Sequence, residues 1–287
     1  MNPFPTRIVG IDRPEAARDA VALATALGGQ DGLILARTYV FDPEAGEEFA
    51  GYRRSLAEHA ERELAAAAEA SGVQAELVAV PEISPARGLK RLAERREADL
   101  LVVGASHRGR VGRAILGSVS RAVLHGAPCP VAVAPKGCAD TLARPATIGV
   151  GYDGRPESRA ALALAERAAE AYGARLSLLA AIPPPEAFPL APEEFHGWVG
   201  LAEDAMSTAR EALDEALAGL RVPAEGQVVS EHASRALERL SASVDLIVCG
   251  SRGWGAAKRV VLGSTSDRLI HRAECPVVVA PRVDDEQ

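Results

Sequence analysis

The 287-residue sequence carries 32 lysine and arginine residues against 39 aspartate and glutamate residues, which gives a formal net charge of −7. Since an acidic surface repels phosphate backbones and anionic lipid headgroups, this balance argues against nucleic-acid binding and against binding to an anionic membrane. No apolar run approaches the roughly 20 residues that span a bilayer, and the first residues lack a signal-peptide core, so we expect a cytoplasmic protein.

Short apolar runs alternate with helix-length segments along the first half of the chain. The runs predict strands at residues 7–11, 32–40, 75–80, 99–105 and 130–135, and the segments between them predict helices that end at Leu27 or cover 55–70, 85–96 and 118–125. Near-continuous apolar strands such as DLLVV are typical of a parallel sheet covered by helices on both faces. The alternation therefore predicts a doubly wound α/β domain, which binds ligands beyond the carboxyl ends of its strands.

The chain contains this pattern twice. The segment ADLLVVGASHRGRVGRAILGSVSRAVLHGAPCPVAVAP, residues 98–135, returns as VDLIVCGSRGWGAAKRVVLGSTSDRLIHRAECPVVVAP, residues 244–281. Self-similarity over this length indicates that a whole domain has been duplicated. We therefore predict two tandem doubly wound domains with five-stranded parallel sheets, at residues 1–140 and 141–287.

A glycine-rich stretch follows the fourth strand of the second copy. Gly250 directly follows the apolar run DLIVC, Gly253 comes three positions later, and after nine further residues Gly263-Ser264 opens a helix. Glycine lets backbone N–H groups approach an anion, and the first N–H groups of a helix form a second anion site. Residues 250–266 hold three basic residues and no acid. The stretch favours a phosphate-binding loop, although a lone glycine motif also fits a tight turn with a solvated basic loop.

The spacing G-x2-G-x9-G-S, the aspartate after the first strand and the CPVVVAP ending resemble the nucleotide-binding universal stress proteins. The resemblance covers nearly the whole chain, as two tandem domains. It implies a Rossmann-like fold of the adenine nucleotide alpha hydrolase-like type, ATP binding with or without Mg²⁺, and a regulatory role under stress. It also implies that the last strands, in PVAVAP and PVVVAP, pair the two domains within the chain, with a homodimer as a further option.

The resemblance implies a role for individual residues of the second copy. It places Asp153 on the adenosine, Ala181 beside the adenine, Gly250, Gly253, Gly263 and Ser264 around the ribose and phosphates, and Ser266 on the same helix turn. For Asp153 an alternative is a helix-capping role ahead of the segment GRPES.

The first copy departs from the motif at one position. Asp12, Thr38, Gly104, Gly117, Ser118 and Ser120 align with the second-copy site residues, but His107 stands where Gly253 is expected. A non-glycine residue disfavours positive φ, although a histidine could itself contact phosphate. Nucleotide binding at the first site therefore stays open.

The remaining sequence offers no catalytic residues. The four cysteines show no metal-binding or disulfide spacing, and no Ser-His-Asp order, HExxH motif or carboxylate pair is visible. Asp12 or Asp153 could hold Mg²⁺ against phosphates, yet no residue is assignable as a water-orienting base. An adenine-nucleotide-binding regulator is therefore the leading hypothesis. The alternatives are a nucleotide-free interaction module and a slow ATPase. The Pro-rich segment 183–198 is either a flap over the second site or a loop.

Overall fold

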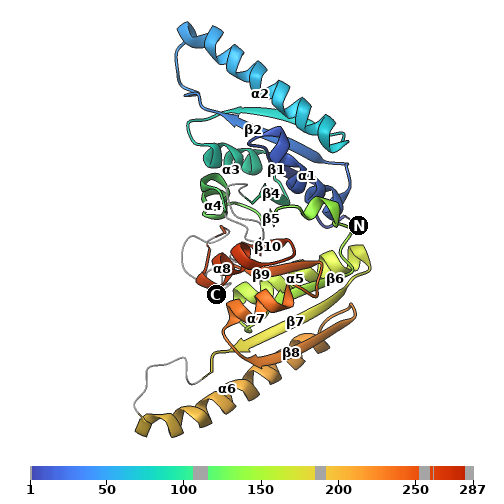
Figure 1. Ribbon diagram of the computed structural model, residues 1–287, viewed down its shortest axis with the longest axis vertical. Helices are drawn as coiled ribbons and strands as arrows, with labels where there is room; N and C mark the ends of the chain where they lie inside the picture. Colours follow the sequence, from blue (N-terminus) through green and yellow to red (C-terminus); the bar gives the residue numbers. More distant parts are fainter. Residues whose placement is uncertain (1, 106–115, 185–191, 252–258, 261, 282–287) are drawn as a thin grey trace.

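The structure is a computed structural model that describes residues 2–105, 116–184, 192–251, 259–260 and 262–281. Its strands form one ten-stranded sheet with helices on both faces (Figure 1). Among the described residues, no helix is long and apolar enough to cross a membrane.

The first half contains β1 to β5. Its strands are β1 (Arg7–Gly10), β2 (Leu33–Tyr39), β3 (Glu76–Pro81), β4 (Leu100–Gly104) and β5 (Val131–Ala134). Its helices are α1 (Pro14–Gly28), α2 (Ala50–Ser71), α3 (Pro85–Arg95) and α4 (Ser118–Leu124), with 3-10 turns η1 (Glu47–Phe49) and η2 (Cys138–Asp140). The expected strands and helices are present, and α2 begins five residues earlier than the sequence suggested.

The second half repeats this order. Its strands are β6 (Thr147–Gly151), β7 (Arg175–Ile182), β8 (Ala224–Ser230), β9 (Leu246–Gly250) and β10 (Val277–Ala280). Its helices are α5 (Pro156–Tyr172), α6 (Pro192–Ala218), α7 (Ala233–Leu240) and α8 (Ser264–Arg272). The Pro-rich segment 183–198 thus runs into the first turns of α6, and its residues 185–191 lie outside the described part of the chain.

The strand order of the sheet is β3-β2-β1-β4-β5-β10-β9-β6-β7-β8. All strand pairs within each half are parallel, which confirms two doubly wound five-stranded units. The halves meet where β5 and β10 pair antiparallel, with Ala132 opposite Val278. The predicted pairing of the last strands within the chain is therefore confirmed. The domain boundaries at residues 140 and 141 stay a prediction.

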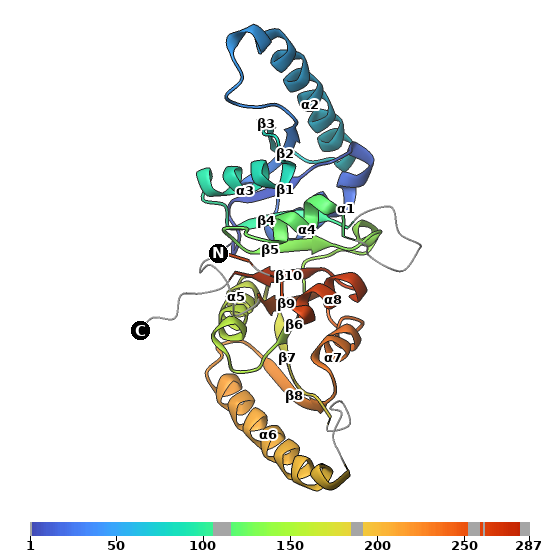
Figure 2. The same ribbon diagram turned by 90° about the vertical axis from the view of Figure 1, so that its left-hand side faces the viewer.

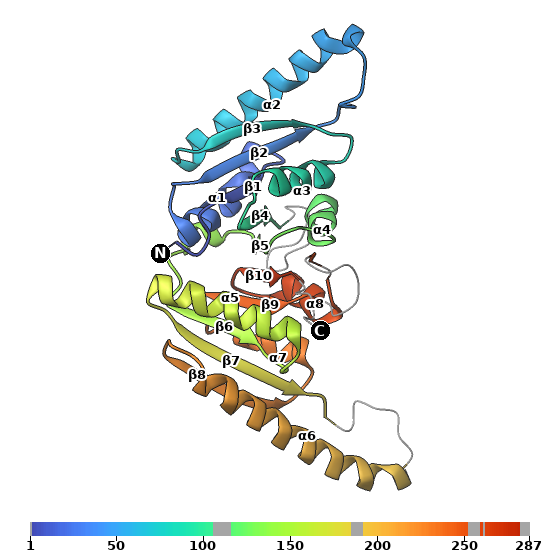
Figure 3. The same ribbon diagram turned by 180° about the vertical axis from the view of Figure 1, so that it is seen from behind.

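The helices cover the sheet in two layers. Buried side chains of α1, α2, α5 and α6 form one apolar cluster with one face of the sheet, and those of α3, α4, α7 and α8 form another on the opposite face. Figures 2 and 3 show these layers from two sides, with the long helices α2 and α6 at the two ends of the molecule. Because both faces are covered, the strands are apolar almost throughout, as the sequence indicated.

Backbone hydrogen bonds also join the two halves beside the sheet. The Gly126 N–H donates to the Val260 carbonyl (2.7 Å), and the Val260 N–H donates to the Ala127 carbonyl (3.0 Å). The neighbouring Arg259 donates to the Gly126 carbonyl (3.0 Å) and pairs with Glu94 of α3 (2.7 Å). The segment that precedes α8 is thus attached to the turn that precedes β5.

One arginine is fully buried at the start of β1. Arg7 has no exposed surface and donates to the backbone carbonyls of Phe4, Pro5, Gly29 and Asp31. Burial lowers the pKa of the Arg7 guanidinium, because the charged form has lost its water. The four carbonyls compensate for that loss and connect the N-terminal segment to the end of α1. Nothing in the sequence distinguishes this arginine from the exposed ones.

We expect the Arg7→Met variant to lower the free energy of unfolding by roughly 3 kcal/mol, because it leaves buried carbonyl groups without donors. Urea denaturation followed by circular dichroism measures this change. Arg18→Met is the control, since the Arg18 side chain is 64% exposed. Equal stability of the two variants would contradict the role assigned to Arg7.

Candidate functional site

A cavity of about 730 Å³ lies at the carboxyl ends of the second-half strands. The sequence-predicted residues among those lining it are Asp153, Ala181, Gly250, Gly263, Ser264 and Ser266. They come from four separate places in the chain, namely the ends of β6, β7 and β9 and the start of α8. The structure therefore brings together every predicted second-site residue that it describes. Gly253 lies outside the described residues.

The position of the cavity follows from the sheet topology. Strands β6 and β9 are neighbours, yet the chain leaves β6 for α5 on one face and leaves β9 for α8 on the other. At such a point the two connections diverge and leave a crevice beyond the strand ends. The fold thus opens a space at the place where the sequence motif lies.

Asp153 is fixed by the turn ahead of α5. Its carboxylate accepts a hydrogen bond from the Arg155 N–H (3.1 Å) and lies 3.7 Å from the Arg155 guanidinium. The N-cap residue of α5 is Arg155 and not Asp153, so the helix-capping alternative for Asp153 is wrong. The Asp153 side chain is 57% exposed, so its carboxylate remains accessible at the cavity wall.

The start of α8 presents free backbone N–H groups to the cavity. Gly263 is the N-cap, and its own N–H donates to the Ser266 hydroxyl (3.0 Å). Ser264 and Thr265, the first two residues of the helix, line the cavity. With φ −83° and ψ 165°, Gly263 has a backbone conformation that any residue adopts. The backbone conformation of Gly263 therefore does not by itself require glycine.

At Gly250, packing within the protein requires a glycine. A Cβ atom at this position would lie 2.6 Å from the Glu157 carbonyl oxygen, at the first turn of α5. The packing of α5 against β9 therefore demands glycine here whether or not a ligand binds. Gly250 is both a cavity residue and a structural one.

Ser251 also lines the cavity, although the sequence motif does not include it. Ser251 is 8% exposed, and its buried hydroxyl oxygen has no hydrogen-bond partner among the residues that the structure describes. A buried, unpaired polar group costs about 1–3 kcal/mol, so it is informative in a folded protein. The motif allows any residue at this position, so sequence spacing gave no reason to single it out.

The first half has a smaller counterpart, a cavity of about 400 Å³. Its lining includes the predicted first-site residues Asp12, Thr38, Gly104, Gly117, Ser118 and Ser120. Arg37 donates to the Asp12 carbonyl, and the Ser120 hydroxyl donates to the Gly104 carbonyl (2.9 Å). His107 lies outside the described residues, so the effect of a histidine in the loop stays a prediction.

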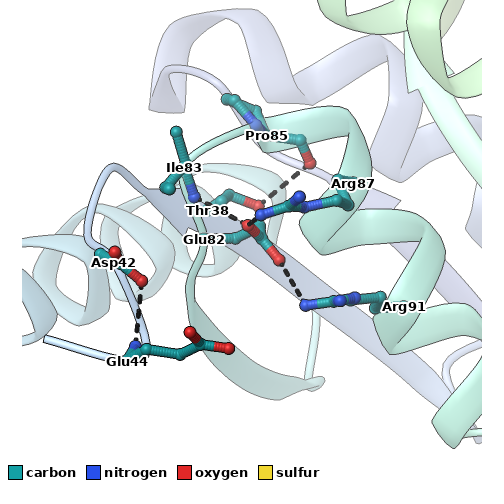
Figure 4. A network of polar contacts seen from close by, with 8 residues as sticks. All are labelled: Thr38, Asp42, Glu44, Glu82, Ile83, Pro85, Arg87 and Arg91. Carbon is teal, nitrogen blue, oxygen red and sulfur yellow. Dashed lines mark hydrogen bonds and ion pairs between the residues drawn. The ribbon is translucent and has the colours of Figure 1, made fainter.

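A polar network borders the first cavity at Thr38 (Figure 4). The Thr38 hydroxyl donates to the Pro85 carbonyl at 3.3 Å. Beside it, the buried Glu82 carboxylate receives hydrogen bonds from Arg87 and Arg91. The hydrogen bond from Arg87 holds the pKa of Glu82 below its usual value. The network holds the start of α3 in place, and within it the Thr38 hydroxyl is hydrogen-bonded to the Pro85 carbonyl.

The four cysteines are buried and unpaired. Cys249 is the residue before the end of β9, and it lines the second cavity. Burial raises the pKa of Cys249 to about 12, and the thiols of Cys129, Cys138 and Cys275 have the same value for the same reason. Because the thiolate is the reactive form, none of these side chains is activated as a nucleophile.

Comparison with known proteins now assigns the family. The sequence model of the universal stress protein family matches residues 6–135 and again residues 146–281. The chain belongs to the universal stress protein family. The tandem arrangement inferred from the internal repeat is therefore confirmed, as is the resemblance of the chain to this family.

Individual relatives agree with this assignment. Universal stress protein Rv2623 of Mycobacterium tuberculosis is 31% identical over 291 residues, which cover 95% of both chains. Universal stress protein Rv2005c of the same organism is 36% identical over 191 residues, which cover 64% of this chain but only 62% of the relative. The crystal structure of a universal stress protein from Archaeoglobus fulgidus superposes with a TM-score of 0.66 at 19% identity, over 97% of this chain and 99% of that one, and so supports the fold.

We expect the native protein to react with less than one equivalent of a thiol reagent such as DTNB within minutes at pH 8, because its thiols are buried and protonated. In urea all four cysteines should react. One rapidly reacting thiol that is absent from a Cys249→Ser variant would contradict this expectation and assign a reactive cysteine to the cavity.

Proposed function

We propose that this universal stress protein binds an adenine nucleotide, ATP in the first place, in the second-half cavity and acts as a regulatory protein. The observation that supports the proposal is the convergence of the motif residues on one cavity at the start of α8. A volume of about 730 Å³ lies within the roughly 300–1,000 Å³ common for small-molecule sites.

The lining of the cavity suits both parts of a nucleotide. The N–H groups that follow Gly263 and the positive end of the α8 dipole favour phosphates. Leu179, Ala181 and Leu237, which also line the cavity, provide apolar surface for a base. Asp153 lies on the wall, where its carboxylate is placed to accept hydrogen bonds from ribose hydroxyls or to approach a phosphate-bound Mg²⁺.

A binding role explains these residues better than catalysis. Among the described residues that line the cavity, Asp153 and Glu157 are the carboxylates, and no histidine or lysine accompanies them. Phosphoryl transfer needs a residue that orients the attacking water beside the terminal phosphate, and we assign this role to neither carboxylate. We therefore propose a nucleotide-dependent regulator, cytoplasmic, whose two halves pair within one chain.

Calorimetric titration of the nucleotide-stripped protein with ATP tests the proposal. We expect saturable binding with a stoichiometry of at least one ATP per chain, because the second-half cavity carries the complete motif. Absence of binding would contradict the proposal and leave a nucleotide-free interaction module. Saturable, Mg²⁺-dependent release of phosphate would instead assign an ATPase.

A Gly263→Asp variant tests the placement of the phosphates. Aspartate is a favoured N-cap, so α8 should be as stable as before or more so, while the carboxylate occupies the free N–H groups and repels phosphate. We expect ATP affinity at the second site to fall by well over about tenfold, with an unchanged or higher melting temperature.

The matched control is Gly117→Asp, which makes the same change at the start of α4. It should leave ATP binding at the second site intact. Gly253→Glu tests the motif itself, and we expect it to abolish binding by placing bulk and negative charge against the phosphates. Wild-type ATP affinity in Gly263→Asp would show that the phosphates lie elsewhere.

A further inference from the structure

The two cavities are lined by corresponding residues, which allows a comparison position by position. Asp12 corresponds to Asp153, Gly104 to Gly250, and Gly117-Ser118 to Gly263-Ser264. These shared positions leave the differences easy to see. Three of the differences exchange a hydroxyl group for an apolar side chain.

At the start of the helix, the second cavity has hydroxyl groups where the first has apolar side chains. Ser251 is replaced by Ala105, and Thr265 by Val119. Both pairs occupy equivalent places, directly after β9 or β4 and at the second residue of α8 or α4. At these two positions the second cavity therefore has hydroxyl donors that the first cavity lacks.

The Ser251 hydroxyl is the more informative of the two. It is buried with no partner among the described residues, and Ser251 continues the row of Ile247 and Cys249, which faces α7 and α8. Thus the orphaned hydroxyl belongs to the wall on the helix side of the cavity, where phosphate oxygens are the acceptors that a nucleotide would supply. Ala105, which is equally buried, has no polar atom to satisfy.

The Ser120 hydroxyl of the first cavity and its counterpart Ser266 in the second are both engaged by the protein, since Ser120 donates to the Gly104 carbonyl (2.9 Å) and Ser266 donates to the Gly263 carbonyl (3.2 Å). The Thr38 hydroxyl, where the second half has Ala181, is engaged as well, because it donates to the Pro85 carbonyl (3.3 Å; Figure 4). The first cavity is also the smaller, at about 400 Å³ against about 730 Å³.

We propose that the two halves select ligands with different numbers of phosphates. The second cavity takes a nucleoside polyphosphate, with Ser251 donating to a phosphate oxygen, and the first takes a nucleoside with at most one phosphate. This inference rests on the proposed nucleotide function and adds that the duplicated sites have diverged. A single chain would then respond to two forms of the same nucleotide.

Calorimetry with ATP and AMP on separated sites tests the proposal. In the full chain, Gly263→Asp blocks the second site and leaves the first, and Gly117→Asp does the reverse. We expect the second site to prefer ATP to AMP and the first site to prefer AMP to ATP. The same order of preference at both sites, or no AMP binding at the first, would overturn the proposal.

The contribution of Ser251 is tested by Ser251→Ala in the Gly117→Asp background. We expect the ATP-to-AMP affinity ratio at the second site to fall about tenfold, as for loss of one hydrogen bond to a charged group. Without nucleotide, the melting temperature should stay the same or rise, because the variant removes an unpaired hydroxyl. An unchanged ratio would overturn the role of Ser251.

The reciprocal change, Ala105→Ser with Val119→Thr in the Gly263→Asp background, should shift the first site toward ATP. Failure of the proposed function has a different signature, since then neither ATP nor AMP binds the wild-type chain. If both bind and the two sites show one preference, the nucleotide function stands and only the divergence of the sites is wrong.

Discussion

The antiparallel pairing of β5 with β10 is the constraint on which the rest of the molecule depends. It merges two parallel five-stranded sheets into one and buries an edge strand of each, which otherwise would expose unpaired backbone groups. Because the two strands run in opposite directions, the beginning of β5 lies beside the end of β10. The carboxyl ends of the second-half strands, where the large cavity opens, therefore lie next to the turn that enters β5.

This arrangement links the candidate phosphate site to the other half. The segment ahead of α8 forms backbone hydrogen bonds with that turn through Val260, and Arg259 reaches across to Glu94. Arg259 belongs to the basic stretch that the sequence analysis related to phosphate binding. In the structure its guanidinium donates to the Gly126 carbonyl and pairs with Glu94. Arg259 therefore contributes to the junction between the two halves.

Much of the fold could be predicted because the duplicated chain shows its strand and helix patterns in two copies. The alternation of apolar runs with helix-length segments indicated doubly wound units, and these are present. The sequence could not reveal what depends on contacts between distant segments. Arg7 differs from the other arginines only through its four carbonyl acceptors, which the sequence does not show. The packing reason for Gly250 becomes visible only with the Glu157 carbonyl beside it in the fold. Ser251 occupies a position that the motif leaves free, so only its burial with no partner among the described residues distinguishes it.

We propose that the second-half cavity holds an adenine nucleotide with its phosphates at the start of α8. A crystal structure of the protein with ATP tests this most directly. We expect the base to lie beside Ala181 and Leu237, and phosphate oxygens to lie within hydrogen-bond distance of the N–H groups that follow Gly263. A nucleotide bound elsewhere, or bound here with its phosphates pointing away from α8, would contradict it.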